Sequence, residues 1–124
     1  MTKAPFVLIV EDDEWVAEQL ARTLNGVGIR TEHAPHALAA IDMIDALPPA
    51  AIVLDVLLAG PNAFTLLHEL KSHSDLADLP VILCTASADQ LVQEDLSAYG
   101  VRQVLDKATM MPDDLVVAVR KVLP

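Results

Sequence analysis

The chain is poor in cysteine, in aromatic residues and in positive charge, and each shortage excludes something. Its single cysteine, Cys84, rules out a disulfide within the chain and fits the reducing environment of the cytosol. Aromatic residues make up 3% of the sequence and hydrophobic residues 53%, so we expect a core of valine, leucine, isoleucine and alanine. Lysine and arginine number 8 against 18 acidic residues, and the net charge is −10. Such a surface repels phosphate backbones, so we expect no nucleic-acid partner.

The chain also lacks a long apolar run. The stretch Phe6–Val10 is too short for a signal sequence or a membrane span, and no basic segment precedes it in the pattern of a signal peptide. We therefore expect a soluble, cytoplasmic protein with no membrane partner. A length of 124 residues fits one ordinary domain, which we expect to cover residues 1–124.

Short apolar runs alternate with segments in which apolar residues recur at helical spacing. The runs predict five strands, at Phe6–Val10, 30–33, 51–54, Val81–Thr85 and 104–105. Helices are predicted by Val16, Leu20 and Leu24; by Leu38, Ile41 and Ile44; by Phe64, Leu67 and Leu70; by the polar segment 90–98; and by Leu115, Val116, Val119 and Val122. Strict alternation predicts an α/β fold with a doubly wound, five-stranded parallel sheet. The flavodoxin-like (βα)5 arrangement with strand order 2-1-3-4-5 is the common solution at this size.

Polar residues stand at the ends of four of these strands: Glu11 and Asp12, Asp55, Thr85 and Lys107. Because the carboxyl ends of parallel strands meet at one edge of a sheet, these side chains should converge at the switch point between the first and third strands. Carboxylates brought so close repel one another unless a cation joins them, and hard oxygen ligands at an open edge favour Mg²⁺. Each residue alone could instead be a helix cap or a solvated surface group; their convergence favours a site.

Other polar residues have simpler interpretations. Asp13 is expected to start a helix, because aspartate favours the first turn beside the helix dipole. Cys84 lies inside a predicted buried strand and is expected to be an inert core thiol. The four histidines share no ligand spacing and are expected to lie at the surface: His33, His36, His68 and His73.

Four segments, taken in order, resemble the sequence blocks of response-regulator receiver domains of two-component signalling. They are Val7-Leu8-Ile9-Val10-Glu11-Asp12-Asp13-Glu14, Ile52-Val53-Leu54-Asp55, Leu83-Cys84-Thr85-Ala86 and Val104-Leu105-Asp106-Lys107. Their separations fit the family, and the resemblance covers essentially the whole chain. It implies a stand-alone receiver, a regulatory domain rather than an enzyme, acting as a monomer or weak homodimer. The implied partners are a sensor histidine kinase or phosphotransfer protein, which gives the phosphate, and an unidentified downstream protein.

The resemblance also implies roles for individual residues. Asp55 would accept the phosphate as an acyl phosphate and, with Asp12, would bind Mg²⁺. Glu11 would assist the metal through water, and the backbone carbonyl of Leu57 would complete the protein ligands. Thr85 would contact the phosphate through its hydroxyl. Lys107 would pair with Asp55 and then, through its charge, with the phosphate.

The sequence departs from the family pattern at three places. The loop over residues 59–63 lacks the usual turn, Val104 stands where an aromatic switch residue is common, and Lys107 is followed by Ala108 rather than proline. A cis bond before a residue other than proline costs about 2.5–4 kcal/mol, so we expect a trans Lys107–Ala108 bond. These changes leave open a pseudo-receiver, which binds partners without using phosphate. A hydrolase on the same fold is less favoured, because Leu57 replaces the second aspartate such an enzyme needs.

Overall fold

The structure is a computed structural model that describes residues 5–55, 63–86 and 96–124. The five strands are β1 Phe6–Val10, β2 Arg30–Ala34, β3 Ala51–Asp55, β4 Val81–Thr85 and β5 Val101–Asp106. The described helices are α1 Glu14–Asn25, α2 Ala37–Ala46, α3 Ala63–Ser72, the short 3₁₀ helix η2 Leu96–Tyr99, and α4 Pro112–Val122. No helix in these ranges is long and apolar enough to cross a membrane.

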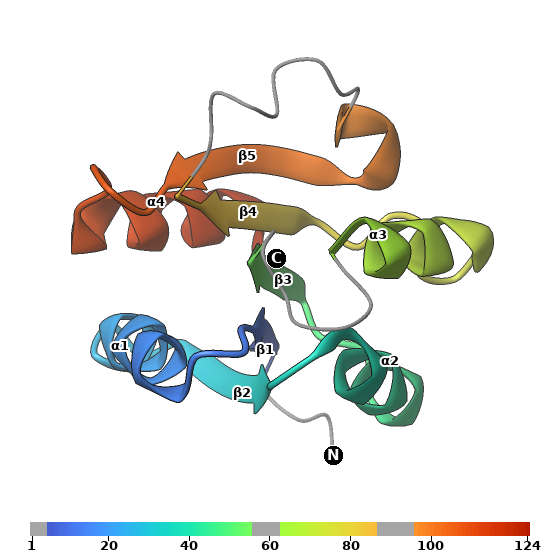
Figure 1. Ribbon diagram of the computed structural model, residues 1–124, viewed down its shortest axis with the longest axis horizontal. Coiled ribbons are helices and arrows are strands. Elements are labelled where there is room, and N and C mark those ends of the chain that lie inside the picture. The colour runs from blue at the N-terminus through green and yellow to red at the C-terminus, as the bar shows by residue number, and fades with distance from the viewer. Residues whose placement is uncertain (1–4, 56–62, 87–95) are drawn as a thin grey trace.

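The strands form one parallel sheet in the order β2-β1-β3-β4-β5, which confirms the predicted flavodoxin-like topology. Helices α1 and α4 cover one face of the sheet, and α2 and α3 cover the other (Figure 1). Since β1 and β3 are neighbours whose helices leave toward opposite faces, the switch point lies between their carboxyl ends.

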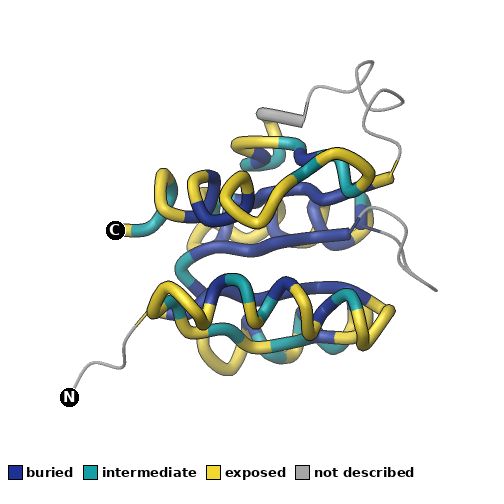
Figure 2. The backbone as a smooth tube through the Cα atoms, turned by 90° about the vertical axis from the view of Figure 1, so that its left-hand side faces the viewer, coloured by how far each residue is buried: buried dark blue, intermediate teal, exposed yellow. Residues whose placement is uncertain are grey.

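Two aliphatic layers, one on each face of the sheet, make up the core. Strands β1, β3 and β4 are buried along their whole length, as their continuous apolar runs predict. The helices show buried residues on one side and exposed residues on the other (Figure 2). Strand β2 is more exposed, as its polar sequence predicts for an edge strand.

Two details differ from the sequence prediction. In α2 the buried residues are Ala37, Ala40 and Ile44, while Leu38 is 58% exposed. This helix is apolar nearly all round, so its periodicity does not show which face is buried. Of the predicted helix over residues 90–98, only the end lies in the described part of the chain, and it forms the 3₁₀ helix η2.

Each edge strand begins after a glycine in a left-handed conformation. Gly28 before β2 has φ +84° and Gly100 before β5 has φ +83°, values that glycine adopts readily and other residues rarely. A Cβ on Gly28 would meet open space, but on Gly100 it would lie 2.8 Å from the carbonyl oxygen of Leu79. The turn into β5 is therefore packed against the chain that leads into β4, while the turn into β2 is not.

Candidate functional site

Three carboxylates meet at the carboxyl edge of the sheet, where β1 and β3 lie side by side. Glu11 and Asp12 directly follow β1, and Asp55 is the last residue of β3. The ladder pairs Val10 with Leu54, so the next residues along the two chains, Glu11 and Asp55, lie at the same level. One oxygen of each carboxylate lies within 4.8 Å of the others. Glu11 and Asp55 are only 2% and 5% exposed, so the cluster is a buried pair with Asp12 as its solvent-facing member.

The ammonium group of Lys107 lies against the two buried carboxylates. Its Nζ is 2.7 Å from Oε2 of Glu11 and 3.3 Å from Oδ1 of Asp55. The backbone N–H of Lys107 donates to the carbonyl of Thr85 at 2.8 Å, so the end of the β4–β5 ladder sets where the lysine enters the site. The pairing with Asp55 implied by the family resemblance is present, but the shorter contact is with Glu11.

Negative charge exceeds positive charge in this site. Burial raises the pKa of Glu11, and the hydrogen bond from Lys107 only partly offsets that shift, while the charge of Asp55 adds to it. Burial lowers the pKa of Lys107, but its hydrogen bond to Glu11 and the charges of Asp55 and Glu11 outweigh burial, so the pKa is raised. One lysine thus stays charged among three carboxylates, and a further cation would relieve the repulsion that remains.

Strand β4 brings a hydroxyl and a thiol to the same edge. Thr85 is its last residue and is buried. Cys84 pairs with Asp55 in the β3–β4 ladder, and burial raises its pKa to about 12. Cys84 is fully buried, which confirms the predicted core position, and a thiol with a raised pKa is expected to be unreactive.

The two exposed aspartates in the turn from β1 into α1, Asp12 and Asp13, have different structural surroundings. Asp13 is the N-cap of α1: its Oδ1 accepts hydrogen bonds from the N–H of Trp15 at 2.9 Å and of Val16 at 3.1 Å. Its own N–H donates to Oε1 of Glu11 at 3.2 Å. The predicted helix-start role of Asp13 is confirmed. The carboxylate of Asp12 makes no hydrogen bond or ion pair within the described ranges, so it faces solvent beside the buried pair.

One contact at this edge was not predicted. His33 Nε2 lies 2.7 Å from the backbone carbonyl oxygen of Glu11, and the histidine is partly buried. The one feature of the sequence that could have indicated this contact is the position of His33, one residue before the end of β2 and beside β1. A second histidine also has a structural role, since His36 caps α2 by accepting from the N–H of Ala39 at 3.1 Å.

The remaining family positions differ in how far the structure describes them. Leu57 and residues 59–62 of the altered loop lie outside the described residues. The Lys107–Ala108 bond is trans, as predicted. Val104 is partly buried and packs against the core layer beneath α2 and α3.

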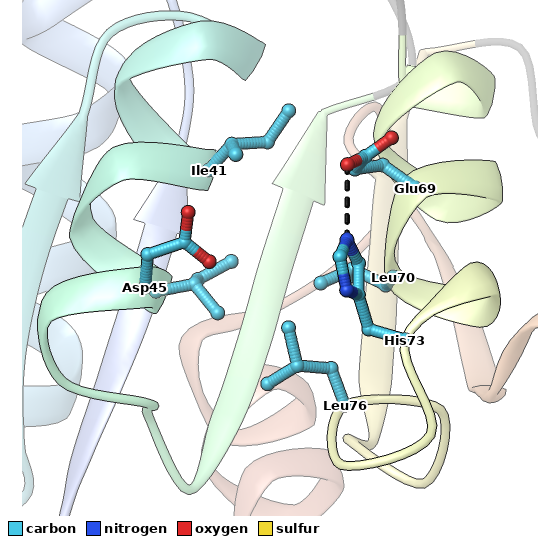
Figure 3. Close-up of a pocket in the computed structure, with 7 residues that line it drawn as sticks. Ile41, Asp45, Glu69, Leu70, His73 and Leu76 are labelled. Atoms are coloured by element: carbon cyan, nitrogen blue, oxygen red, sulfur yellow. Dashed lines mark hydrogen bonds and ion pairs between the residues drawn. The ribbon is translucent and has the colours of Figure 1, made fainter.

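Ionisable groups also surround a small hollow between α2 and α3 (Figure 3). Nε2 of His73, which directly follows α3, lies 3.1 Å from Oε1 of Glu69 on that helix, and Asp45 lies across the hollow on α2. The cavity volume is about 10 Å³, room for one water molecule at most, so the hollow is too small for a ligand.

Comparison with known proteins identifies the family. The family model of the response regulator receiver domain matches residues 7–120. The chain belongs to this family. The receiver is 38% identical to the response regulator MprA of Mycobacterium avium over 80 residues, which are 64% of this chain and 34% of that protein. The match thus spans about a third of that relative's length.

Solved receivers share the fold. The signal receiver domain of a signal transduction histidine kinase from Syntrophus aciditrophicus is 29% identical, with a TM-score of 0.83 over 97% of this chain and 90% of that chain. The response regulator TrrA from Thermotoga maritima, solved in complex with Mg²⁺ and BeF, is 22% identical, with a TM-score of 0.84 over 97% of this chain and all 100% of that chain. The chain is therefore a receiver domain of two-component signalling.

Proposed function

We propose that the receiver accepts a phosphoryl group on Asp55 from a phosphohistidine of a sensor histidine kinase or phosphotransfer protein. The observation that supports this most is the meeting of Asp55 with Glu11, Asp12 and Lys107 at the switch point of the sheet. The domain, covering residues 1–124, would act as a regulator that assists its own modification rather than as an enzyme with a separate substrate.

Asp55 is the candidate nucleophile because it ends the central strand and lies beside the ammonium group of Lys107. One Oδ of its carboxylate would attack phosphorus as the P–N bond to the donor imidazole breaks, and the leaving imidazole would take up a proton. The acyl phosphate that forms adds negative charge, so neutralising groups must already be in place. Lys107, 3.3 Å from Asp55, is one such group.

The carboxylates fit Mg²⁺ because they are hard oxygen donors crowded at an open edge with too little positive charge. Asp12 and Asp55 would bind the ion directly, Glu11 would assist through water, and the carbonyl of Leu57 would complete the protein ligands. When bound, the ion supplies charge neutralisation for the transferred phosphoryl oxygens. The Mg²⁺–BeF complex of TrrA supports this assignment.

Two residues would hold the transferred group. The hydroxyl of Thr85 ends the strand beside β3 and would donate a hydrogen bond to a phosphoryl oxygen. The ammonium of Lys107 would move from its carboxylate partners toward the new charge, as charge-assisted bonds to phosphate are strong. The signal would pass to a downstream protein, with the receiver a monomer or weak homodimer.

Intact mass spectrometry after incubation with Mg²⁺ and a small acyl-phosphate donor tests the proposal. Wild type should gain one phosphoryl mass in an adduct labile to acid and base, and Asp55→Asn should gain none. Full labelling of the Asn variant would reject Asp55 as the acceptor.

A pseudo-receiver remains the second candidate, favoured by Val104 and Ala108, which replace residues that receivers commonly use to read the phosphate. It predicts no adduct on wild type under the same conditions and partner binding that does not change with the donor.

A further inference from the structure

We propose that His33 is a positioning residue of this site, which fixes the backbone at Glu11 and thereby sets the direction in which Asp12 presents its carboxylate. The inference deepens the proposed function, on which it rests for the identity of the ion. Nothing in the family's sequence blocks assigned a role to this histidine.

Strand β2 holds both peptide groups of Glu11. The N–H of Glu11 donates to the carbonyl of Ala34 at 3.1 Å, and its carbonyl oxygen lies 2.7 Å from Nε2 of His33. The first bond continues the parallel ladder between β1 and β2. The second lies beyond the ladder and is made by a side chain, so it depends on which residue stands at position 33.

The chemistry of the partner fixes the direction of this bond. A backbone carbonyl oxygen only accepts, so Nε2 of His33 must carry the hydrogen and donate it. Either the neutral ring with hydrogen on Nε2 or the charged ring satisfies this condition. The contact therefore needs a donor at the Nε2 position and does not need a charge on the ring.

Fixing this carbonyl orients Asp12 because the two residues share one planar peptide unit. The carbonyl of Glu11 and the N–H of Asp12 rotate together, so a held carbonyl also sets the start of the Asp12 backbone. On the other side, Asp13 is held by its N–H bond to Glu11 Oε1 and by its cap on α1. Asp12 is thus positioned through both neighbours while its own carboxylate makes no hydrogen bond within the described ranges.

Three substitutions separate the donor from the shape of the ring. His33→Leu removes the donor, and His33→Gln places an amide N–H at the same distance along the side chain as Nε2. His33→Asn also carries an amide, but its side chain is one bond shorter and should not reach Glu11. Affinity for Mg²⁺ alone is measured by titration, followed by the fluorescence of Trp15 and by amide chemical shifts of residues 11–13. Circular dichroism first establishes a temperature at which every variant is folded.

We expect His33→Leu and His33→Asn to bind Mg²⁺ about three- to tenfold more weakly, the scale of one lost hydrogen bond, and His33→Gln to recover affinity to within about twofold of wild type. Equal affinity in all four proteins would overturn the inference, and so would an equal loss in all three variants, since the donor would then not be what matters.

Phosphorylation of wild type on Asp55 is measured in parallel. If wild type is phosphorylated while the substitutions leave Mg²⁺ affinity unchanged, the inference fails and the proposed function stands. If wild type binds Mg²⁺ with the predicted variant pattern but is never phosphorylated, the proposed function fails and the inference stands.

Discussion

The two edge strands, β2 and β5, both reach the acidic site with a side chain near their carboxyl ends, yet they contribute different physical effects. β5 leads directly to Lys107, whose charge lies 2.7 Å from Glu11 Oε2. β2 brings His33, which bonds to the backbone of the same residue. The β5 edge places a positive charge beside the Glu11 carboxylate, and the β2 edge holds the Glu11 backbone in place.

This difference explains why one residue was predicted and the other was not. A lysine after the last strand is part of an ordered pattern of charged residues, which a sequence displays. A hydrogen bond from a side chain to a backbone carbonyl leaves no such pattern, because the carbonyl belongs to every residue. Substitutions at the two edges should therefore have distinct results.

Among these substitutions, the largest loss in free energy of unfolding should come from replacing a glycine that precedes an edge strand. Gly28→Ala is expected to cost about 1 kcal/mol, the penalty of a left-handed backbone. Gly100→Ala is expected to cost about 2–4 kcal/mol, because its Cβ would also lie 2.8 Å from the Leu79 carbonyl oxygen. Urea unfolding at neutral pH measures both, and similar costs at the two positions would contradict the difference in packing.

A smaller effect is expected from removing the charge that β5 delivers. Lys107→Met should cost about 1–3 kcal/mol, because Glu11 is left buried without its partner. Since burial already raises the pKa of Glu11, protonation of that carboxyl limits the loss. The double variant Glu11→Gln, Lys107→Met should recover at least half of the stability in urea unfolding. A double variant as unstable as Lys107→Met would show that the ion pair is not the cause.

Mg²⁺ should stabilise the receiver by about 1.5 kcal/mol at tenfold its dissociation constant, since only the folded chain assembles the three carboxylates. Asp12→Ala should abolish this response while leaving the metal-free stability nearly unchanged, because Asp12 is exposed. Asp13→Ala is the matched control: it should lose about 1 kcal/mol through the N-cap and keep the response. Thermal melts in chelator and in excess Mg²⁺ measure both, and a response that survives Asp12→Ala would exclude Asp12 as a ligand.

The sequence predicted the sheet well because buried parallel strands must be continuously apolar, as β1, β3 and β4 are. The convergence of Glu11, Asp12 and Asp55 followed from topology alone, since parallel strands end at one edge. The prediction of the buried face of α2 was wrong at Leu38, which is exposed. A helix that is apolar nearly all round has too little periodicity to show which face is buried. Predicting the hydrogen bond of His33 would have required the exact register between β1 and β2. A shift of one residue in that register would turn the His33 side chain to the other face of the sheet and remove the bond.

The smallest effect on stability should come from substituting His73, which lies after α3, away from both edge strands. This substitution is a control for those at His33. The hydrogen bond to Glu69 raises the pKa of His73 (Figure 3). Burial lowers this pKa, but the charges of Glu69, Asp75 and Asp45 raise it further, so it lies above the ordinary value. Because the folded pKa lies above the ordinary value of 6.5, the stabilisation is fully present below that pH and is lost as pH rises through the folded pKa. His73→Gln should therefore be slightly less stable than wild type near pH 5.5 and equal to it near pH 9, with Mg²⁺ affinity unchanged throughout. Urea unfolding at the two pH values measures this, with Glu69→Gln as the partner control. A loss of stability that is the same at both pH values would mean that the ion pair does not contribute.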